Sequence, residues 1–117
     1  MEEKDIKFYI GHCLTYIALG KNALRLYYEQ KDRNTNLLII INKLCELKTK
    51  IAKQYTIIEP NNDIGKACIK CSLQRLMNAK TALDMVVKID KGLEPMYNEF
   101  NIILMDLVKY IQKKKNG

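Results

Sequence analysis

Hydrophobic residues recur at every third or fourth position along most of the chain, and this spacing predicts α-helices. In the first such segment, residues 5–31, a second set of apolar residues widens the apolar face until little of the surface is left for water. A helix with this pattern must be covered on several sides, so we expect residues 5–31 to form the helix around which the others pack. Its first apolar face comprises Ile6, Ile10, Cys13, Ile17, Gly20, Leu24 and Tyr27.

Helix-capping and helix-breaking residues divide the chain into four segments. A polar cluster follows the first segment, and Pro60 follows the second. Gly92 is suited to end the third segment, and Pro95 fits the first turn of the fourth. The predicted helices cover approximately residues 5–31, 35–58, 62–90 and 94–114.

One stretch also permits another structure. The run from Leu37 to Ile41 is apolar on every side, as in a short buried strand. We reject the strand because helical spacing continues beyond this run and no second strand-like segment is present to pair with it. Four helices of similar length with short connections predict an all-α, antiparallel up-down-up-down four-helix bundle, with residues 1–117 as a single domain.

The composition of the chain bears on its cellular location and on its net charge. No run approaches the roughly 20 apolar residues that a membrane-spanning helix needs. The charged, acidic start is unlike a secretory signal, so we expect a cytoplasmic protein with no membrane partner. The formal net charge is +7, from 20 Lys and Arg against 13 Asp and Glu. This excess favours an acidic partner, although a genome rich in Lys, Asn and Ile codons would produce it without any function.

The four cysteines raise the question of metal or redox chemistry. Cys68 and Cys71 have the CxxC spacing of zinc knuckles and thiol–disulfide centres. A four-thiolate zinc site would also need Cys13 and Cys45 from two other helices. Since both members of the CxxC pair fall within a predicted helix, we expect four reduced thiols packed as small hydrophobic residues, with no disulfide, no metal and no cofactor.

Other catalytic arrangements are also not expected. His12 and Cys13 are adjacent, and neighbouring helical side chains diverge by about 100°, so the imidazole does not reach the thiol. Asp84, Glu99 and Asp106 are isolated from one another along the sequence. The sequence therefore predicts neither an enzyme nor a small-molecule substrate.

Lysines give the sharpest functional hypothesis. Lys66 and Lys70 lie in the first two turns of the predicted third helix, where positive charge opposes the helix dipole. An up-down-up-down bundle would bring five further lysines to that end, where free backbone N–H groups already favour anions. We expect this end to bind the phosphate backbone of RNA or DNA with little sequence selectivity and a strong salt dependence. The predicted nucleic-acid-binding residues are Lys50, Lys53, Lys66, Lys70, Lys113, Lys114 and Lys115.

The alternative is a protein-binding adaptor or a chaperone-like bundle whose positive charge is incidental. A small-residue face on the first helix and two aliphatic residues near the ends of a polar stripe on the second are typical of an interface. Both a homo-oligomer and a larger protein assembly would use such surfaces. The predicted interface residues are Gly11, Thr15, Ala18, Ile39 and Ile57.

Overall fold

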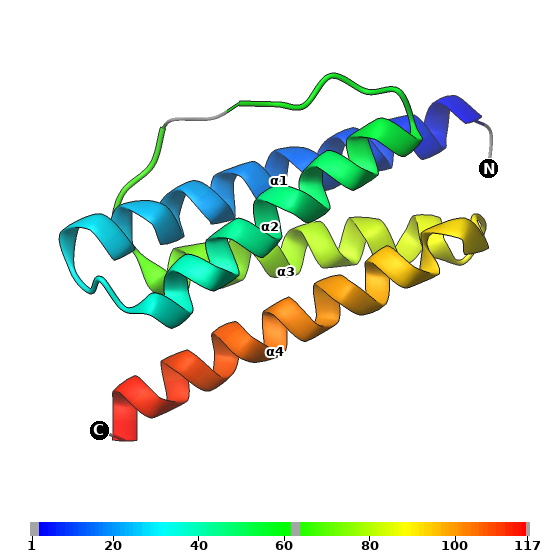
Figure 1. Cartoon of the computed structure of the whole chain (residues 1–117). Helices are drawn as coiled ribbons and strands as arrows, with labels where there is room; N and C mark the ends of the chain where they lie inside the picture. Colours follow the sequence, from blue (N-terminus) through cyan, green and yellow to red (C-terminus); the bar gives the residue numbers. More distant parts are fainter. Residues whose placement is uncertain (1–2, 62–63, 117) are drawn as a thin grey trace.

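The protein is an elongated bundle of four helices, as predicted (Figure 1). The computed structural model describes residues 3–61 and 64–116. Helices α1 and α3 make the most extensive contact, and smaller contacts join α1 to α2, α2 to α4 and α3 to α4. The helices are α1 (Glu3–Gln30), α2 (Thr35–Gln54), α3 (Ile69–Val87) and α4 (Glu94–Asn116), and a short 3-10 helix, η1 (Lys91–Leu93), precedes α4.

The order of helix directions differs from the predicted alternation. The connection from Tyr55 to Cys68, here called the crossover, leads back to the end of the bundle where α2 began (Figure 1). As a result α2 and α3 run in the same direction, and the chain goes up, down, down and up. Each helix is still antiparallel to its two neighbours: α1 and α4 each pack against both α2 and α3.

The second helix ends earlier than its apolar pattern indicates. Thr56 has a positive φ of 54°, and the N–H of Ile57 donates to the carbonyl oxygen of Ala52. The N–H of Thr56 donates to the oxygen of Lys53, which completes a Schellman motif. The predicted end at residue 58 is wrong, because the apolar spacing that reaches Ile58 does not continue as helix. Ile58 is 93% exposed, and Ile57 packs on the core from outside the helix.

The third helix begins later than predicted. Residues 62 and 63, where the predicted helix starts, lie outside the described residues, and residues 64–68 are not helical. Cys68 has an extended backbone, and its sulfur accepts a hydrogen bond from the N–H of Cys71, which makes Cys68 the N-cap of α3. Helices α1 and α4 match the predicted segments to within two residues at each end.

The core is closest packed where α1 crosses α3. A Cβ atom at Gly20 would lie 2.7 Å from the Leu76 side chain and 3.1 Å from the Ser72 carbonyl oxygen. The Ser72 hydroxyl also donates to the Gly20 carbonyl oxygen at 2.6 Å. Gly20 therefore lets the two helices approach each other closely. The largest fully buried side chains are Phe100, Ile10, Leu14, Ile17, Leu24, Leu37, Leu44, Leu47, Ile51, Leu76, Leu83 and Leu93.

Polar side chains of α1 and α2 hold the crossover against the bundle. The buried amide of Asn22 donates to the Ile64 carbonyl oxygen at 2.9 Å. The Lys48 ammonium donates to the Pro60 carbonyl oxygen at 3.3 Å and lies 3.8 Å from the Glu59 carboxylate. Burial lowers the pKa of Lys48, and the nearby Lys21 charge lowers it further. The crossover is thus bonded to both helices.

Within the described residues, none of the helices has the length and apolar content required to span a membrane.

Candidate nucleic-acid interface

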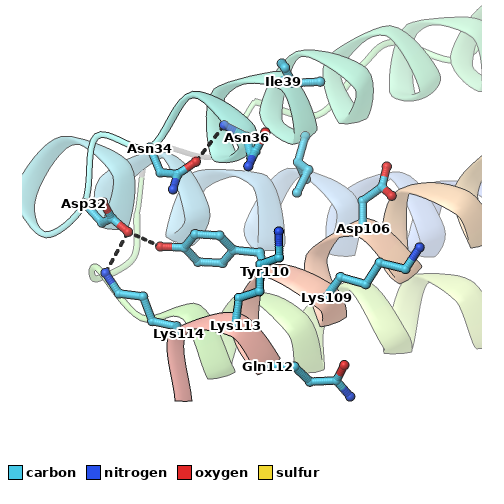
Figure 2. Close-up of a pocket in the computed structure, with 11 residues that line it drawn as sticks. Asp32, Asn34, Asn36, Ile39, Asp106, Lys109, Tyr110, Gln112, Lys113 and Lys114 are labelled. Carbon is cyan, nitrogen blue, oxygen red and sulfur yellow. Dashed lines mark hydrogen bonds and ion pairs between the residues drawn. The ribbon is translucent and has the colours of Figure 1, made fainter. Parts of the chain in front are cut away.

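An open cleft lies between the start of α2 and the end of α4, beside the turn that joins α1 to α2 (Figure 2). Its volume is about 1020 Å³, and most of its lining side chains are polar. We call it the end cleft. The residues that line it are Asp32, Asn34, Asn36, Ile39, Ile40, Asp106, Lys109, Tyr110, Gln112, Lys113 and Lys114.

The wall formed by α2 is a helix N-terminus without acidic residues. Asn34 caps the helix, because its side-chain oxygen accepts a hydrogen bond of 2.8 Å from the N–H of Asn36. The first turn that follows contains no Asp or Glu. No carboxylate of this first turn therefore offsets the partial positive charge of the helix end, and Asp32, which precedes the cap, is engaged by Tyr110 and Lys114.

The opposite wall carries the lysines of α4. Lys109 and Lys113 are spaced by four residues, which places them on one helix face, and Lys114 follows one position later. All three are exposed. Of these three, only Lys114 is paired with a carboxylate within the part of the chain that the structure describes. Lys109 and Lys113 thus border the cleft without an ion pair to a carboxylate of the described residues.

Asp32 joins the two walls. Its carboxylate accepts a hydrogen bond from the Tyr110 hydroxyl and another, at 2.7 Å, from the Lys114 ammonium (Figure 2). The hydrogen bonds from Lys114 and Tyr110 hold the pKa of Asp32 below its usual value. Burial raises the pKa of Tyr110, and the bond to Asp32 raises it further. The cluster fixes the end of α4 against the α1–α2 turn.

The other carboxylate of the end cleft is also close to a cation. Asp106 lies 4.0 Å from the Lys43 ammonium, which comes from the neighbouring turn of α2. Each acidic group in the lining thus has a lysine within 4.0 Å, and with Lys109 and Lys113 the cleft carries an excess of positive charge.

The structure brings only some of the predicted nucleic-acid-binding lysines together. Since α3 and α4 are antiparallel, α3 starts at the end of the bundle where α4 finishes, and the crossover brings this end beside the α1–α2 turn (Figure 1). The exposed Lys and Arg side chains at this end, which we call the basic end, are Lys31, Arg33, Lys66, Lys70, Lys109, Lys113, Lys114 and Lys115.

Lys50 and Lys53 do not belong to the basic end. They lie in the last two turns of α2, at the opposite end of the molecule. Lys50 is 3.3 Å from the Glu99 carboxylate of α4. The predicted convergence of these two residues on the start of α3 is wrong, because it depended on an up-down-up-down order of helices.

The predicted protein-interface residues are also divided. Thr15 is exposed, and a Cβ atom at Gly11 would have no neighbour within 4 Å, so this part of the α1 face is open. Ala18 is buried, and Ile57 packs on the core as part of the crossover. Ile39 is 45% exposed and lines the end cleft. These five residues do not form one continuous surface.

The expectation of four reduced cysteines is wrong for the CxxC pair. Cys68 and Cys71 form a disulfide, with their Cα atoms 5.3 Å apart. The sequence analysis expected both cysteines inside one helix. Cys68 is instead the N-cap residue of α3, and its extended backbone turns its side chain toward Cys71. Cys13 and Cys45 are free thiols. Among the described residues, no three His, Cys, Asp or Glu side chains are grouped as a metal site would require.

Sequence reasoning missed the α2 side of the end cleft. Asn34, Asn36, Lys109 and Tyr110 were not predicted as site residues. Two signals were available: the acid-free start of α2 and the four-residue spacing of Lys109 and Lys113. Neither reveals that the two segments face each other.

Comparisons with protein-family models, with curated proteins and with solved structures find no match to this chain.

Proposed function

We propose that the protein is a non-enzymatic, intracellular accessory or scaffold subunit that binds the phosphate backbone of nucleic acid through its basic end. The observation that carries the proposal is the end cleft, in which Lys109 and Lys113 face the acid-free N-terminus of α2. Both features favour the binding of phosphate groups, since lysines supply positive charge and a helix N-terminus supplies the positive end of the helix dipole.

The surroundings extend this surface beyond the cleft. Lys31 and Arg33 lie in or beside the α1–α2 turn, Lys115 lies at the end of α4, and Lys66 and Lys70 flank the start of α3. A nucleic-acid strand presents several phosphates at once. A cationic surface spread over three helix ends therefore fits a nucleic-acid strand better than it fits a small anion. Without exposed aromatic side chains in the cleft for base stacking, such contacts would read the backbone and not the sequence.

Charge-neutralised variants test the proposal. In the basic-end variant, Lys109, Lys113 and Lys115 are each replaced by Gln. Fluorescence anisotropy with labelled single-stranded RNA and duplex DNA at low salt should show affinity reduced by about tenfold or more. The slope of log affinity against log salt should become shallower by about 2 to 3, because three phosphate contacts are lost.

The matched control carries the same change in net charge at the other end of the molecule, with Lys50, Lys53 and Lys91 replaced by Gln. Lys50 and Lys53 lie at the end of α2 and Lys91 in η1. This variant should lose much less affinity than the basic-end variant. Equal losses from the two variants would show that binding follows net charge alone and would contradict a site at the basic end.

A second candidate function, protein association, rests on a separate observation. The outer face of α4 exposes three aliphatic side chains spaced three residues apart: Ile102 and Met105 at 58% each, and Val108 at 37%. A contiguous exposed apolar surface of this kind is typical of an adaptor or an oligomer interface. Light scattering at micromolar concentration tests self-association: replacing Met105 with Lys should convert an oligomer to a monomer, and a wild-type monomer would exclude self-assembly.

A further inference from the structure

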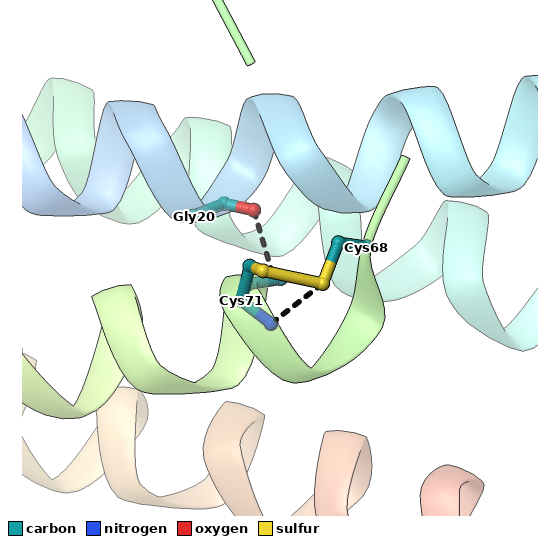
Figure 3. The surroundings of a disulfide bond; sticks show 4 residues. Gly20, Cys68 and Cys71 are labelled. Atoms are coloured by element: carbon teal, nitrogen blue, oxygen red, sulfur yellow. Dashed lines mark hydrogen bonds between the residues drawn. A yellow bond between two sulfur atoms is a disulfide. The ribbon is translucent and has the colours of Figure 1, made fainter. Parts of the chain in front are cut away.

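The disulfide between Cys68 and Cys71 lies at the N-terminus of α3, on the side that faces α1 (Figure 3). Cys68 is the N-cap residue, and Cys71 is three positions further along, in the first turn. The Cα separation of 5.3 Å lies within the usual range for disulfides. Both residues are half-buried, so a small reagent has access to the pair from one side.

The surroundings of Cys68 favour a thiolate when the disulfide is reduced. Its sulfur accepts a 3.1 Å hydrogen bond from the N–H of Cys71, which is one of the first-turn N–H groups that have no acceptor within the helix and lie at the positive end of its dipole. The first turn of α3 contains no acidic residue. Lys66 and Lys70 are exposed on either side, and neither pairs with a carboxylate within residues 3–61 and 64–116. A thiolate at a helix N-terminus beside lysines is the reactive form of cysteine.

The start of α3 is held in place by contacts other than the disulfide. The buried Ser72 hydroxyl donates to the Gly20 carbonyl oxygen at 2.6 Å (Figure 3). Leu76 packs directly on Gly20. These contacts fix the first turns of α3 on α1 whether or not the two sulfur atoms are bonded. The two cysteines therefore stay adjacent after reduction, which is the condition for the bond to form again.

We propose that Cys68 and Cys71 form a redox-active dithiol–disulfide pair that exchanges with low-molecular-weight thiols, with Cys68 as the attacking thiolate. In the oxidising direction, Cys68 attacks one sulfur of a small disulfide RSSR, its S–S bond breaks and RS⁻ leaves. The Cys71 thiol then loses its proton and attacks the Cys68 sulfur, and the second RS⁻ leaves. In total the two protein thiols lose two electrons and two protons, and RSSR becomes two RSH.

The two remaining cysteines serve as internal references. Cys13 is fully buried in α1, and burial raises the pKa of its thiol to about 12, which keeps it protonated and unreactive. Cys45 is half-buried on α2, where its sulfur accepts a hydrogen bond of 3.3 Å from the Lys21 ammonium. Neither has a second cysteine bonded to it, so neither can complete the exchange by forming an internal disulfide.

The first test uses the wild-type chain. The folded protein is equilibrated in mixtures of reduced and oxidised glutathione, approached from both the reduced and the oxidised side, and free thiols are alkylated and assigned by peptide mass spectrometry. The Cys68–Cys71 disulfide should follow the glutathione ratio reversibly, while Cys13 stays reduced throughout. A pair that stays fully oxidised or fully reduced across the whole series would overturn the proposal.

The second test separates the roles of the two sulfur atoms. Ser is a favoured N-cap residue, so Cys68→Ser keeps the cap of α3, and Cys71→Ser changes a half-buried position; circular dichroism should show wild-type helix content for both. With oxidised glutathione, Cys71→Ser should accumulate a mixed disulfide on Cys68 about tenfold faster than Cys68→Ser accumulates one on Cys71. Equal rates, or faster reaction at Cys71, would contradict the assignment of Cys68 as the attacking thiolate.

Discussion

At the scale of single residues, Asp32 links the turn after α1 to the end of α4. Asp32 follows α1, and its carboxylate accepts hydrogen bonds from Tyr110 and Lys114 near the end of α4. Because the hydrogen bonds from Lys114 and Tyr110 lower the pKa of Asp32, the charged carboxylate stabilises the folded state. This contribution is fully present above the unfolded pKa of about 3.9 and is lost as the pH falls through the lower folded pKa.

Unfolding at acidic pH should therefore reveal how the Asp32 carboxylate contributes to stability. The wild-type free energy of unfolding, measured by urea titration, should fall more steeply on acidification below about pH 4 than that of Asp32→Asn, which has no proton to bind at this position. Asp106→Asn is the control, because Asp106 lies 4.0 Å from Lys43, too far for a hydrogen bond. If Asp32→Asn and the control show the same pH dependence as wild type, the Asp32 cluster does not stabilise the fold.

This residue also shows how far sequence reasoning reaches. Asp32 belongs to the polar cluster from which the end of the first helix was predicted, and that prediction is confirmed. Its partners Tyr110 and Lys114 are separated from it by 78 and 82 positions, and no local pattern joins them. The positions of helices can be predicted from the periodicity within one segment. The end cleft cannot, because it depends on which distant segments pack against each other.

At the scale of helices, the contact between α1 and α3 depends on one glycine. Gly20 and Gly11 both lie inside α1, but only Gly20 faces another helix at close range. Within a helix, glycine costs about 0.5–1 kcal/mol relative to alanine, so a substitution is favourable where space is free. The two positions therefore form a matched pair that separates helix propensity from packing.

Replacing each glycine with alanine should change stability in opposite directions. Gly20→Ala should destabilise the protein by about 1–3 kcal/mol, because its Cβ would overlap Leu76 and press on the backbone of Ser72. Gly11→Ala should stabilise it by about 0.5–1 kcal/mol. Urea denaturation measures both. A Gly20→Ala variant as stable as wild type would mean that α1 and α3 are not in close contact at this position.

The crossover is the element that sequence analysis could not place. A Schellman turn with Thr56 in the left-handed conformation ends α2 without the usual glycine, and a cysteine caps α3 in place of the usual Ser, Thr, Asp or Asn. Since both signals are atypical, the segment was predicted as a tight turn between longer helices. The resulting error in helix direction also misplaced Lys50 and Lys53.

The hydrogen bonds from α1 and α2 should protect the crossover from proteolysis. Asn22→Ala removes the hydrogen bond to the Ile64 carbonyl oxygen and should cost about 1–2 kcal/mol. Limited proteolysis at residues 55–61 should become faster than in the wild type. Asn98→Ala, at an exposed position on α4, should change neither property. Unchanged proteolysis in Asn22→Ala would show that this bond does not hold the crossover.

At the scale of the whole molecule, the helix directions gather positive charge at one end. The basic end combines the α1–α2 turn, the start of α3 and the last turns of α4. At the opposite end, Lys50 is paired with Glu99. The sequence correctly placed Lys66, Lys70 and the three terminal lysines at a common end, but it could not identify the end cleft, because that cleft exists only after α2 and α4 have packed.

The most direct test of the account is a map of nucleic-acid contacts on the isotope-labelled protein. In NMR titrations with single-stranded RNA and with duplex DNA at low salt, backbone amide shifts should change mainly at residues 31–36 and 109–115, and the changes should disappear as salt is raised. No shift changes at low salt, or changes centred on Ile102, Met105 and Val108, would contradict binding of nucleic acid at the basic end.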